Sequence, residues 1–163
     1  MVGKNTIKYQ KYFEPIVNFW VSGKIVDGEK LSDVINERHE NVKYLPGRKL
    51  PLNVLAIENL VEACKDATIL IFVVPHQAIQ SENFNLPDYI KFSEVLDQLD
   101  GKIKPNAIAV SLIKGISKDS DGELKLISEE IEERLQIDTS VLMGANLAPE
   151  VADDKFCEST IGI

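Results

Sequence analysis

The sequence predicts an α/β fold with a doubly wound, mainly parallel sheet. The first observation behind this prediction is the run ATILIFVVPHQ, from Ala67 to Gln77, which is apolar on both faces and stops at a proline, a histidine and an amide. A strand of this kind is usually buried between two helix layers of a parallel sheet. The second observation is that strand-like and helix-like segments alternate along the chain, as they do in βαβ units.

Each expected element follows from its own pattern of apolar residues. Strands are expected where apolar residues form short runs, and helices where they recur at helical spacing. Right-handed crossovers would then place the strands side by side in one parallel sheet. The expected strands are 15–21, 53–57, 67–75, 106–113 and 140–146, and the expected helices are 31–39, 57–67, 93–99 and 124–135.

Length and composition favour one globular domain and exclude several classes of protein. The chain has 163 residues, of which 44% are hydrophobic, so it can bury one ordinary core. Its formal net charge of −8 argues against general binding of nucleic acid or of anionic membranes. Cys64 and Cys157 lack metal-ligand spacing and are expected to be plain buried thiols. No apolar segment resembles a membrane span or a signal peptide, so we expect a cytosolic protein.

Polar side chains follow three of the expected strands. Because the carboxyl ends of parallel strands open onto a crevice where α/β folds bind ligands, these side chains predict a binding site. Lys114 is the strongest candidate, since an ammonium at a strand end can neutralise an anion or polarise a carbonyl. A solvated lysine in a turn remains the alternative for Lys114, and a turn residue that fixes its own backbone is the alternative for Asn146. The polar residues at the three ends are His76 and Gln77, then Lys114 with Gly115, then Gly144, Asn146 and Glu150.

Other polar residues fit structural roles better than catalytic ones. His76 is expected to be a hydrogen-bonded structural histidine, and His39 a solvated loop residue. Asp153 and Asp154 are expected to form an exposed acidic patch.

Two places break the alternation of strands and helices. Residues 78–91 form a polar stretch that is longer than such connections usually need, so we expect an insertion there, and the chain stops at the start of a further apolar strand.

Five segments of the sequence, in the same order, closely resemble the amino-terminal domain of the eukaryotic cytosolic NAD-dependent glycerol-3-phosphate dehydrogenases. The segments are HENVKYLPGRKLP, ILIFVVPHQ, VSLIKGI, GELKLISEEI and SVLMGANLAPEVADDKFCESTIG. The resemblance implies a Rossmann-like fold and an enzyme that reduces dihydroxyacetone phosphate to glycerol 3-phosphate with NADH. It also implies a cytoplasmic homodimer in which this domain precedes a helical carboxyl-terminal domain.

The resemblance also implies roles for individual residues. Lys114 occupies the position of the family lysine that contacts the phosphorylated substrate, and Asn146 is expected to help shape the same pocket. Ala148 occupies the position of the alanine that contacts the dinucleotide. The family's cofactor-packing phenylalanine is replaced by Ala78, although Phe92 could supply the ring if 78–91 is an insertion. The family's catalytic lysine belongs to the carboxyl-terminal domain, so no residue up to Ile163 is expected to match it.

Two departures from the family pattern affect the expected NAD site. The first strand of the family and its GxGxxG turn are missing before 15–21, and without that turn the backbone cannot approach the pyrophosphate closely. Where the family has an aromatic and acidic run near the adenosine, this chain has Ser22, Gly23 and Lys24. We therefore expect residues 1–12 to be an unrelated extension and residues 13–163 to be a partial NAD-binding domain.

Three interpretations remain open at this point. The preferred one is a fragment of a glycerol-3-phosphate dehydrogenase, truncated at both ends, whose activity belongs to the full enzyme and is absent from this chain alone. The second is a truncated isoform that acts as a non-catalytic interaction module. The third is an unrelated α/β domain that binds a phosphorylated small molecule through Lys114 and the GAN turn.

Overall fold

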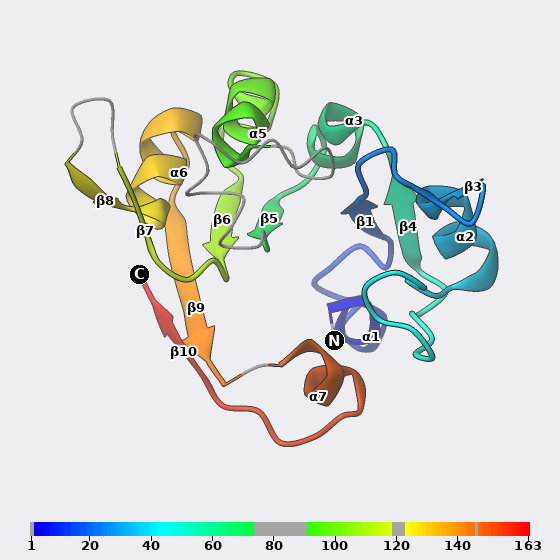
Figure 1. Ribbon diagram of the computed structural model, residues 1–163. Helices are drawn as coiled ribbons and strands as arrows, with labels where there is room; N and C mark the ends of the chain where they lie inside the picture. Colours follow the sequence, from blue (N-terminus) through cyan, green and yellow to red (C-terminus); the bar gives the residue numbers. More distant parts are fainter. Residues whose placement is uncertain (1, 74–90, 119–122, 146) are drawn as a thin grey trace. The chain divides into compact units, whose positions relative to one another are not determined.

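The computed structural model describes residues 2–73, 91–118, 123–145 and 147–163 (Figure 1). The chain divides into two compact units. One comprises Met1–Ala63 with Asn146–Cys157, and the other comprises Cys64–Ala145 with Glu158–Ile163.

The first unit is built on a pair of parallel strands, β1 (Val17–Trp20) and β4 (Val54–Ile57). The register pairs Val17 with Val54 and Trp20 with Ile57, so both strands end at the same edge. The other elements of the unit, shown in Figure 1, are α1 (Val2–Lys8), the hairpin of β2 (Ile25–Val26) and β3 (Glu29–Lys30), α2 (Leu31–Arg38), α3 (Leu60–Cys64) at its boundary, and α7 (Ala148–Ala152).

Helix α2 covers this pair because its apolar residues share one face. Leu31 and Ile35 are buried in a small core with Val21 and Ala56. The helix ends at His39, which has a left-handed backbone (φ 49°) and donates its N–H to the Ile35 carbonyl. A solvated loop role for His39 is therefore wrong, since the residue is a half-buried helix cap.

A side-chain amide of α2 completes the backbone hydrogen bonding of β4. The Asn36 Nδ2 donates to the Ala56 carbonyl over 3.0 Å, and the Ala56 N–H donates to Asn36 Oδ1 over 2.7 Å. A strand edge satisfied in this way offers fewer unpaired groups to another chain.

The amino-terminal segment is anchored to the same unit through Asn53, which directly precedes β4. Its Nδ2 donates to the Gly3 carbonyl over 2.9 Å, to Thr6 Oγ1 over 3.0 Å and to the Pro15 carbonyl. A Cβ added at Gly3 would lie 2.9 Å from a Val54 methyl carbon, so the helix approaches the strand more closely than any side chain would allow.

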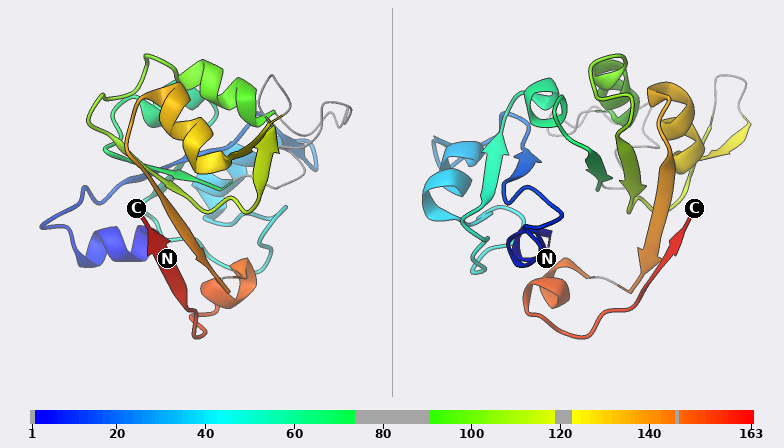
Figure 2. Two further views of the ribbon diagram at one scale, coloured as in Figure 1. Left: turned by 90° about the vertical axis from the view of Figure 1, so that its left-hand side faces the viewer. Right: turned by 180° about the vertical axis from the view of Figure 1, so that it is seen from behind.

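The second unit contains a four-stranded sheet in the order β10-β9-β6-β5. Strands β5 (Ile69–Phe72), β6 (Ile108–Ser111) and β9 (Thr139–Gly144) are parallel, and β10 (Ser159–Gly162) is antiparallel to β9. Helices α5 (Phe92–Leu99) and α6 (Ile127–Leu135) lie on one side of these strands in the left view of Figure 2, and the hairpin of β7 (Ile116–Lys118) and β8 (Leu124–Leu126) precedes α6.

The core of the second unit lies between these helices and one face of the sheet. Leu96 and Ile131 are completely buried, as is Ala109 on the facing side of β6. Helix α6 begins where the Leu126 N–H donates to the Glu129 carboxylate over 3.0 Å. Its buried residues are Ile127, Ile131 and Leu135, whereas Leu126, which the sequence pattern also places in the helix, is the last residue of β8 and is 51% exposed.

The structure confirms the α/β fold and the mainly parallel pairing, with two corrections. In place of one parallel sheet, pairing among the described residues gives four sheets: the β1–β4 pair, the four-stranded sheet, and the β2–β3 and β7–β8 hairpins. The expectation that the strand at 67–75 is buried on both faces is also wrong. Leu70 and Phe72 are buried, whereas Ile69 and Ile71 are 40% and 44% exposed. The predicted insertion lies outside the described residues, apart from Lys91.

Replacement of Asn53 by alanine should release the amino-terminal segment. Losing these hydrogen bonds is expected to cost about 1 to 3 kcal/mol and to speed trypsin cleavage after Lys8 and Lys11. Urea unfolding and timed proteolysis measure the two effects. Gln98→Ala, a change at an exposed site on α5, is the control and should alter neither. Equal behaviour of the two variants would contradict the anchoring role of Asn53.

Candidate functional site

Lys114 lies in a turn that the end of β6 builds. The Leu112 N–H still donates to the Phe72 carbonyl, over 2.9 Å, so the backbone stays in register with β5 past the end of the strand. The Ser111 side chain is 1% exposed, and its hydroxyl accepts the Ile113 N–H over 3.3 Å. Gly115 follows with φ 117°, in the region that favours glycine. Lys114 therefore lies in the chain between the buried Ser111 hydroxyl and Gly115.

The Lys114 ammonium lies at the end of the neighbouring strand. Its Nζ donates to the carbonyl of Gly144, the last residue of β9, over 3.3 Å, while the side chain remains exposed. Since β6 and β9 are parallel neighbours, their carboxyl ends meet here. An exposed ammonium held in this position can bind a phosphate or polarise a carbonyl oxygen.

Four of the other predicted site residues lie outside the described residues: Asn146, Ala78, His76 and Gln77. Phe92 is the first residue of α5 and is only 2% exposed, because its ring packs edge-on against Phe72 with centroids 6.2 Å apart. Its ring therefore belongs to the core of the second unit, and a contact between Phe92 and a cofactor stays a prediction.

Ala148 is exposed and begins α7, in the first unit. The N–H groups of a first helical turn have no partner within the helix, so they can donate to a ligand. Pro149, in the first turn, has the backbone geometry that helix starts favour. The small side chain of Ala148 leaves its backbone accessible.

Two ion pairs fix the residues that follow α7 to the rest of the first unit. The Arg48 guanidinium donates from Nε to Asp153 Oδ1 over 2.8 Å and from Nη2 to Oδ2 over 2.9 Å. The Lys4 ammonium donates to Asp154 over 2.8 Å. Hydrogen bonds from Arg48 hold the pKa of Asp153 below its usual value. The predicted acidic patch is therefore exposed, but both carboxylates are paired with cations.

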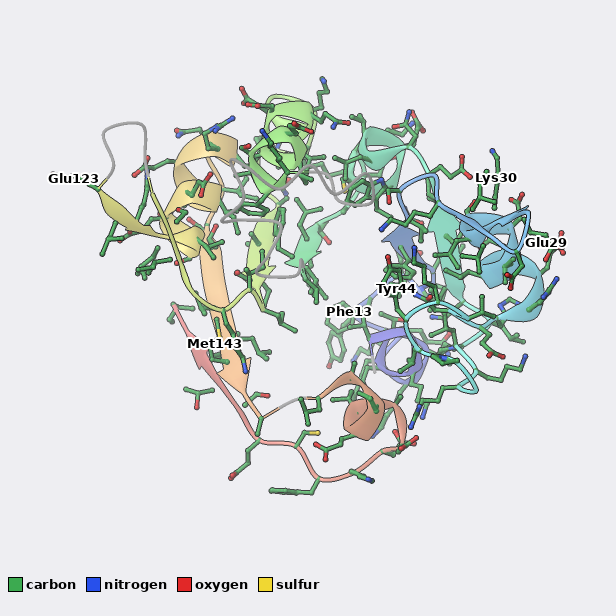
Figure 3. All side chains as sticks on the ribbon, in the orientation of Figure 1. Phe13, Glu29, Lys30, Tyr44, Glu123 and Met143 are labelled. Atoms are coloured by element: carbon green, nitrogen blue, oxygen red, sulfur yellow. The ribbon has the colours of Figure 1, made fainter. Side chains whose placement is uncertain are left out.

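A second group of polar side chains lies near the carboxyl ends of β1 and β4. Glu58 follows β4, and its carboxylate accepts the Ser32 hydroxyl over 2.7 Å and the Lys30 ammonium over 3.1 Å. Chiefly through the Ser32 hydrogen bond, and also through Lys30, the pKa of Glu58 is lowered. Lys24, after β1, donates from Nζ to the Tyr44 hydroxyl over 2.8 Å. Figure 3 shows Tyr44 on the loop between α2 and β4.

Sequence reasoning did not find these long-range pairs, because the partners are far apart in the chain. Arg48 and Asp153 are separated by 105 positions, and Lys24 and Tyr44 by 20. The HENVKYLPGRKLP segment indicated the family, but nothing in it predicted the residues that interact with Tyr44 and Arg48.

The described part of the chain gives no support for a reactive thiol, a metal site or a membrane-spanning helix. Burial raises the pKa of the Cys64 thiol to about 11, so this thiol stays protonated and unreactive at neutral pH. Within residues 2–73, 91–118, 123–145 and 147–163, no three His, Cys, Asp or Glu side chains gather into a group that could hold a metal ion. None of the described helices is long and apolar enough to cross a membrane.

Comparisons with known proteins identify close relatives along the whole chain. The family model for the NAD-dependent glycerol-3-phosphate dehydrogenase N-terminus matches residues 10–163. The chain is 52% identical over 171 residues to a probable glycerol-3-phosphate dehydrogenase 2 of Caenorhabditis elegans. It is also 52% identical over 162 residues to the cytoplasmic NAD(+) glycerol-3-phosphate dehydrogenase of Homo sapiens. Each match covers 99% of this chain, but only 40% and 42% of these two relatives.

Solved structures give the same result. The glycerol-3-phosphate dehydrogenase of Saccharomyces cerevisiae matches 98% of this chain with a TM-score of 0.84 and 37% identity, over 41% of its own length. The Plasmodium falciparum enzyme matches 98% with a TM-score of 0.83 and 37% identity, over 40% of its length. The chain therefore spans about two fifths of the relatives it matches.

Gly115→Ala should strain the turn that carries Lys114. A side chain at φ 117° is expected to cost about 1 to 3 kcal/mol of unfolding free energy. Gly162→Ala is the control, because a Cβ there meets no atom within 4 Å, and it should stay within about 0.5 kcal/mol. Chemical denaturation measures both, and equal losses would contradict a specific requirement for glycine at 115.

Arg48→Gln should raise the pKa of Asp153 toward its ordinary value of 3.8, because the guanidinium that favours the carboxylate is gone. The folded-state pKa is lowered, so the stabilisation by this pair is present above the ordinary pKa and is lost as pH falls through the lowered value. Carboxyl-carbon NMR titration measures the shift. Lys4→Gln is the control, since Lys4 pairs with Asp154, and a shift of Asp153 as large in this variant would contradict the assignment.

Proposed function

Since the chain belongs to the family of NAD-dependent glycerol-3-phosphate dehydrogenases, we propose that it forms the nucleotide-binding part of an enzyme that interconverts glycerol 3-phosphate and dihydroxyacetone phosphate. Membership excludes the interpretation of an unrelated α/β domain. Because the relatives are much longer than this chain, we assign turnover to the longer protein and binding contacts to these residues.

The observation that carries this proposal is the position of Lys114. Its ammonium lies at the meeting point of the β6 and β9 carboxyl ends, where parallel α/β sheets bind their ligands. The substrates are small phosphate monoesters with a hydroxyl or a ketone group. We assign Lys114 the role of binding the substrate through the phosphate or the oxygen at the reacting carbon. Asn146 stays a predicted contributor to the same pocket.

The proposed cofactor is NAD, which accepts or supplies the hydride when it is bound. The accessible backbone at Ala148, at the start of α7, fits a role in holding a nucleotide, and the Arg48–Asp153 pair keeps this helix in place. No GxGxxG spacing occurs among the 163 residues, so these residues offer no glycine-rich turn for the pyrophosphate. A contact between Ala78 and the cofactor also stays a prediction.

Assembly and location are proposed from the relatives. Cytoplasmic relatives support a cytoplasmic enzyme, and a homodimer stays a prediction from the family resemblance. Three further features likewise stay predictions: the boundary between residues 12 and 13, the insertion at 78–91, and the non-catalytic isoform.

Replacing Lys114 by alanine in a full-length enzyme that carries this sequence should lower kcat/KM for dihydroxyacetone phosphate by roughly 100-fold, because one charged contact to the substrate is lost. The dissociation constant of NADH should stay within about twofold. Steady-state kinetics and NADH fluorescence measure the two quantities. Lys102→Ala, at another exposed lysine, is the matched control. Unchanged kinetics in Lys114→Ala would overturn the substrate role.

A further inference from the structure

Ser111, the last residue of β6, is the polar member of a buried row of side chains. Alternate residues of a strand point to the same face of a sheet, and four such residues along β6 and beside it are buried. They are Ala107, Ala109, Ser111 and Ile113, and none of them is more than 3% exposed. Burying a hydroxyl is unfavourable unless it forms a hydrogen bond, so an alanine would fill this position at a lower cost in free energy. The hydroxyl at 111 therefore points to a role other than packing.

The Ser111 hydroxyl ends the strand. The Leu112 N–H continues the hydrogen bonding of the sheet, since it donates to the Phe72 carbonyl over 2.9 Å. The next N–H, that of Ile113, donates instead to Ser111 Oγ over 3.3 Å. A serine that accepts the N–H two residues further along forms a local turn, which competes with continued strand pairing. The hydroxyl thus sets the point at which the backbone leaves β6.

This turn decides where the Lys114 ammonium can lie. The residue before the lysine, Ile113, is buried, and the residue after it, Gly115, has φ 117°. Between them the exposed lysine extends to the Gly144 carbonyl, which its Nζ reaches over 3.3 Å. A lysine side chain is a flexible four-carbon stem, so the reach of its ammonium depends on the direction of the backbone that carries it. Displacing a binding group by about 1 Å is enough to weaken its contribution to turnover strongly.

We propose that Ser111 is a positioning residue for substrate binding. Its buried hydroxyl ends β6 and sets the backbone direction that brings the Lys114 ammonium to the phosphate of the three-carbon substrate. Ser111 itself touches no substrate, so its effect passes entirely through Lys114. The inference rests on the proposed function, because it concerns the same lysine.

The first test is Ser111→Ala in a full-length enzyme that carries this sequence. A phosphate contact is present in the bound substrate and in the transition state alike, so weakening it should raise KM for dihydroxyacetone phosphate about tenfold and leave kcat within about twofold. Ser140→Ala is the matched control, because Ser140 is a half-buried serine on the neighbouring strand β9. It should leave both constants as they are in the unaltered enzyme.

The second test combines Ser111→Ala with Lys114→Ala. If Ser111 acts through the lysine, its hydroxyl has nothing left to position once the ammonium is gone. The double variant should therefore match Lys114→Ala in kcat/KM within about twofold, since residues that act through one contact give non-additive losses. A general loss of structure at 111 would instead add its own decrease to that of Lys114→Ala.

The third test separates positioning from stability. Ser111→Thr keeps the hydroxyl but adds a methyl group at a position that is 1% exposed, so the urea midpoint of unfolding should fall. KM for dihydroxyacetone phosphate should nevertheless stay within about twofold of the unaltered enzyme, because the hydrogen bond that ends the strand is retained. Ser111→Ala should show the opposite combination, a raised KM with the smaller change in midpoint.

The outcomes distinguish this inference from the function on which it rests. An unchanged KM in Ser111→Ala, a further loss in the double variant, or a KM that follows the urea midpoint across the variants would overturn the role of Ser111 and leave that of Lys114 standing. Unchanged kinetics in Lys114→Ala would overturn the proposed substrate role and this inference with it.

Discussion

The parallel pairing of β6 with β9 is the constraint on which the proposed site depends. The register aligns Ala109 with Thr139 and Ser111 with Val141, and a shift by one residue would turn every buried side chain toward the solvent. Packing against α5 and α6 holds this register, since fully burying a side chain such as Leu96 or Ile131 contributes about 1.5 to 3 kcal/mol. Because the register is fixed, both strands end at one place, and Lys114 reaches the carbonyl of Gly144.

The first unit depends more on side-chain hydrogen bonds, because its apolar core is small. The core contains four buried residues, three of which are packed around Ala56 of β4. Asn36 completes the backbone of that strand, Asn53 fixes the amino-terminal segment, and Arg48 fixes the segment that carries α7. Removing any one of these partners leaves polar groups that need another acceptor or donor. The proposed nucleotide contact at Ala148 therefore depends on these polar contacts.

The sequence predicted the elements well where apolar periodicity is strong. The helix at 31–39 and the strands at 53–57 and 106–113 appear as α2, β4 and β6, and Lys114 lies at the predicted strand end. The division of the strands among four sheets could not be predicted, since hydrogen bonding between strands leaves no mark on the pattern of one strand. The buried position of Phe92 could not be predicted either, because its ring packs against Phe72, which is 20 positions earlier in the chain.

If the turn after β6 binds a phosphorylated three-carbon substrate, a titration of the 163-residue chain with glycerol 3-phosphate should reveal that contact. Two-dimensional NMR of the backbone amides would follow the titration at constant pH and ionic strength. We expect saturable shifts concentrated at Ile113, Lys114, Gly115 and Gly144, which inorganic sulfate at the same concentration does not reproduce in full. Saturable shifts that leave these four residues unchanged, or no shifts at millimolar ligand, would contradict substrate binding at this turn.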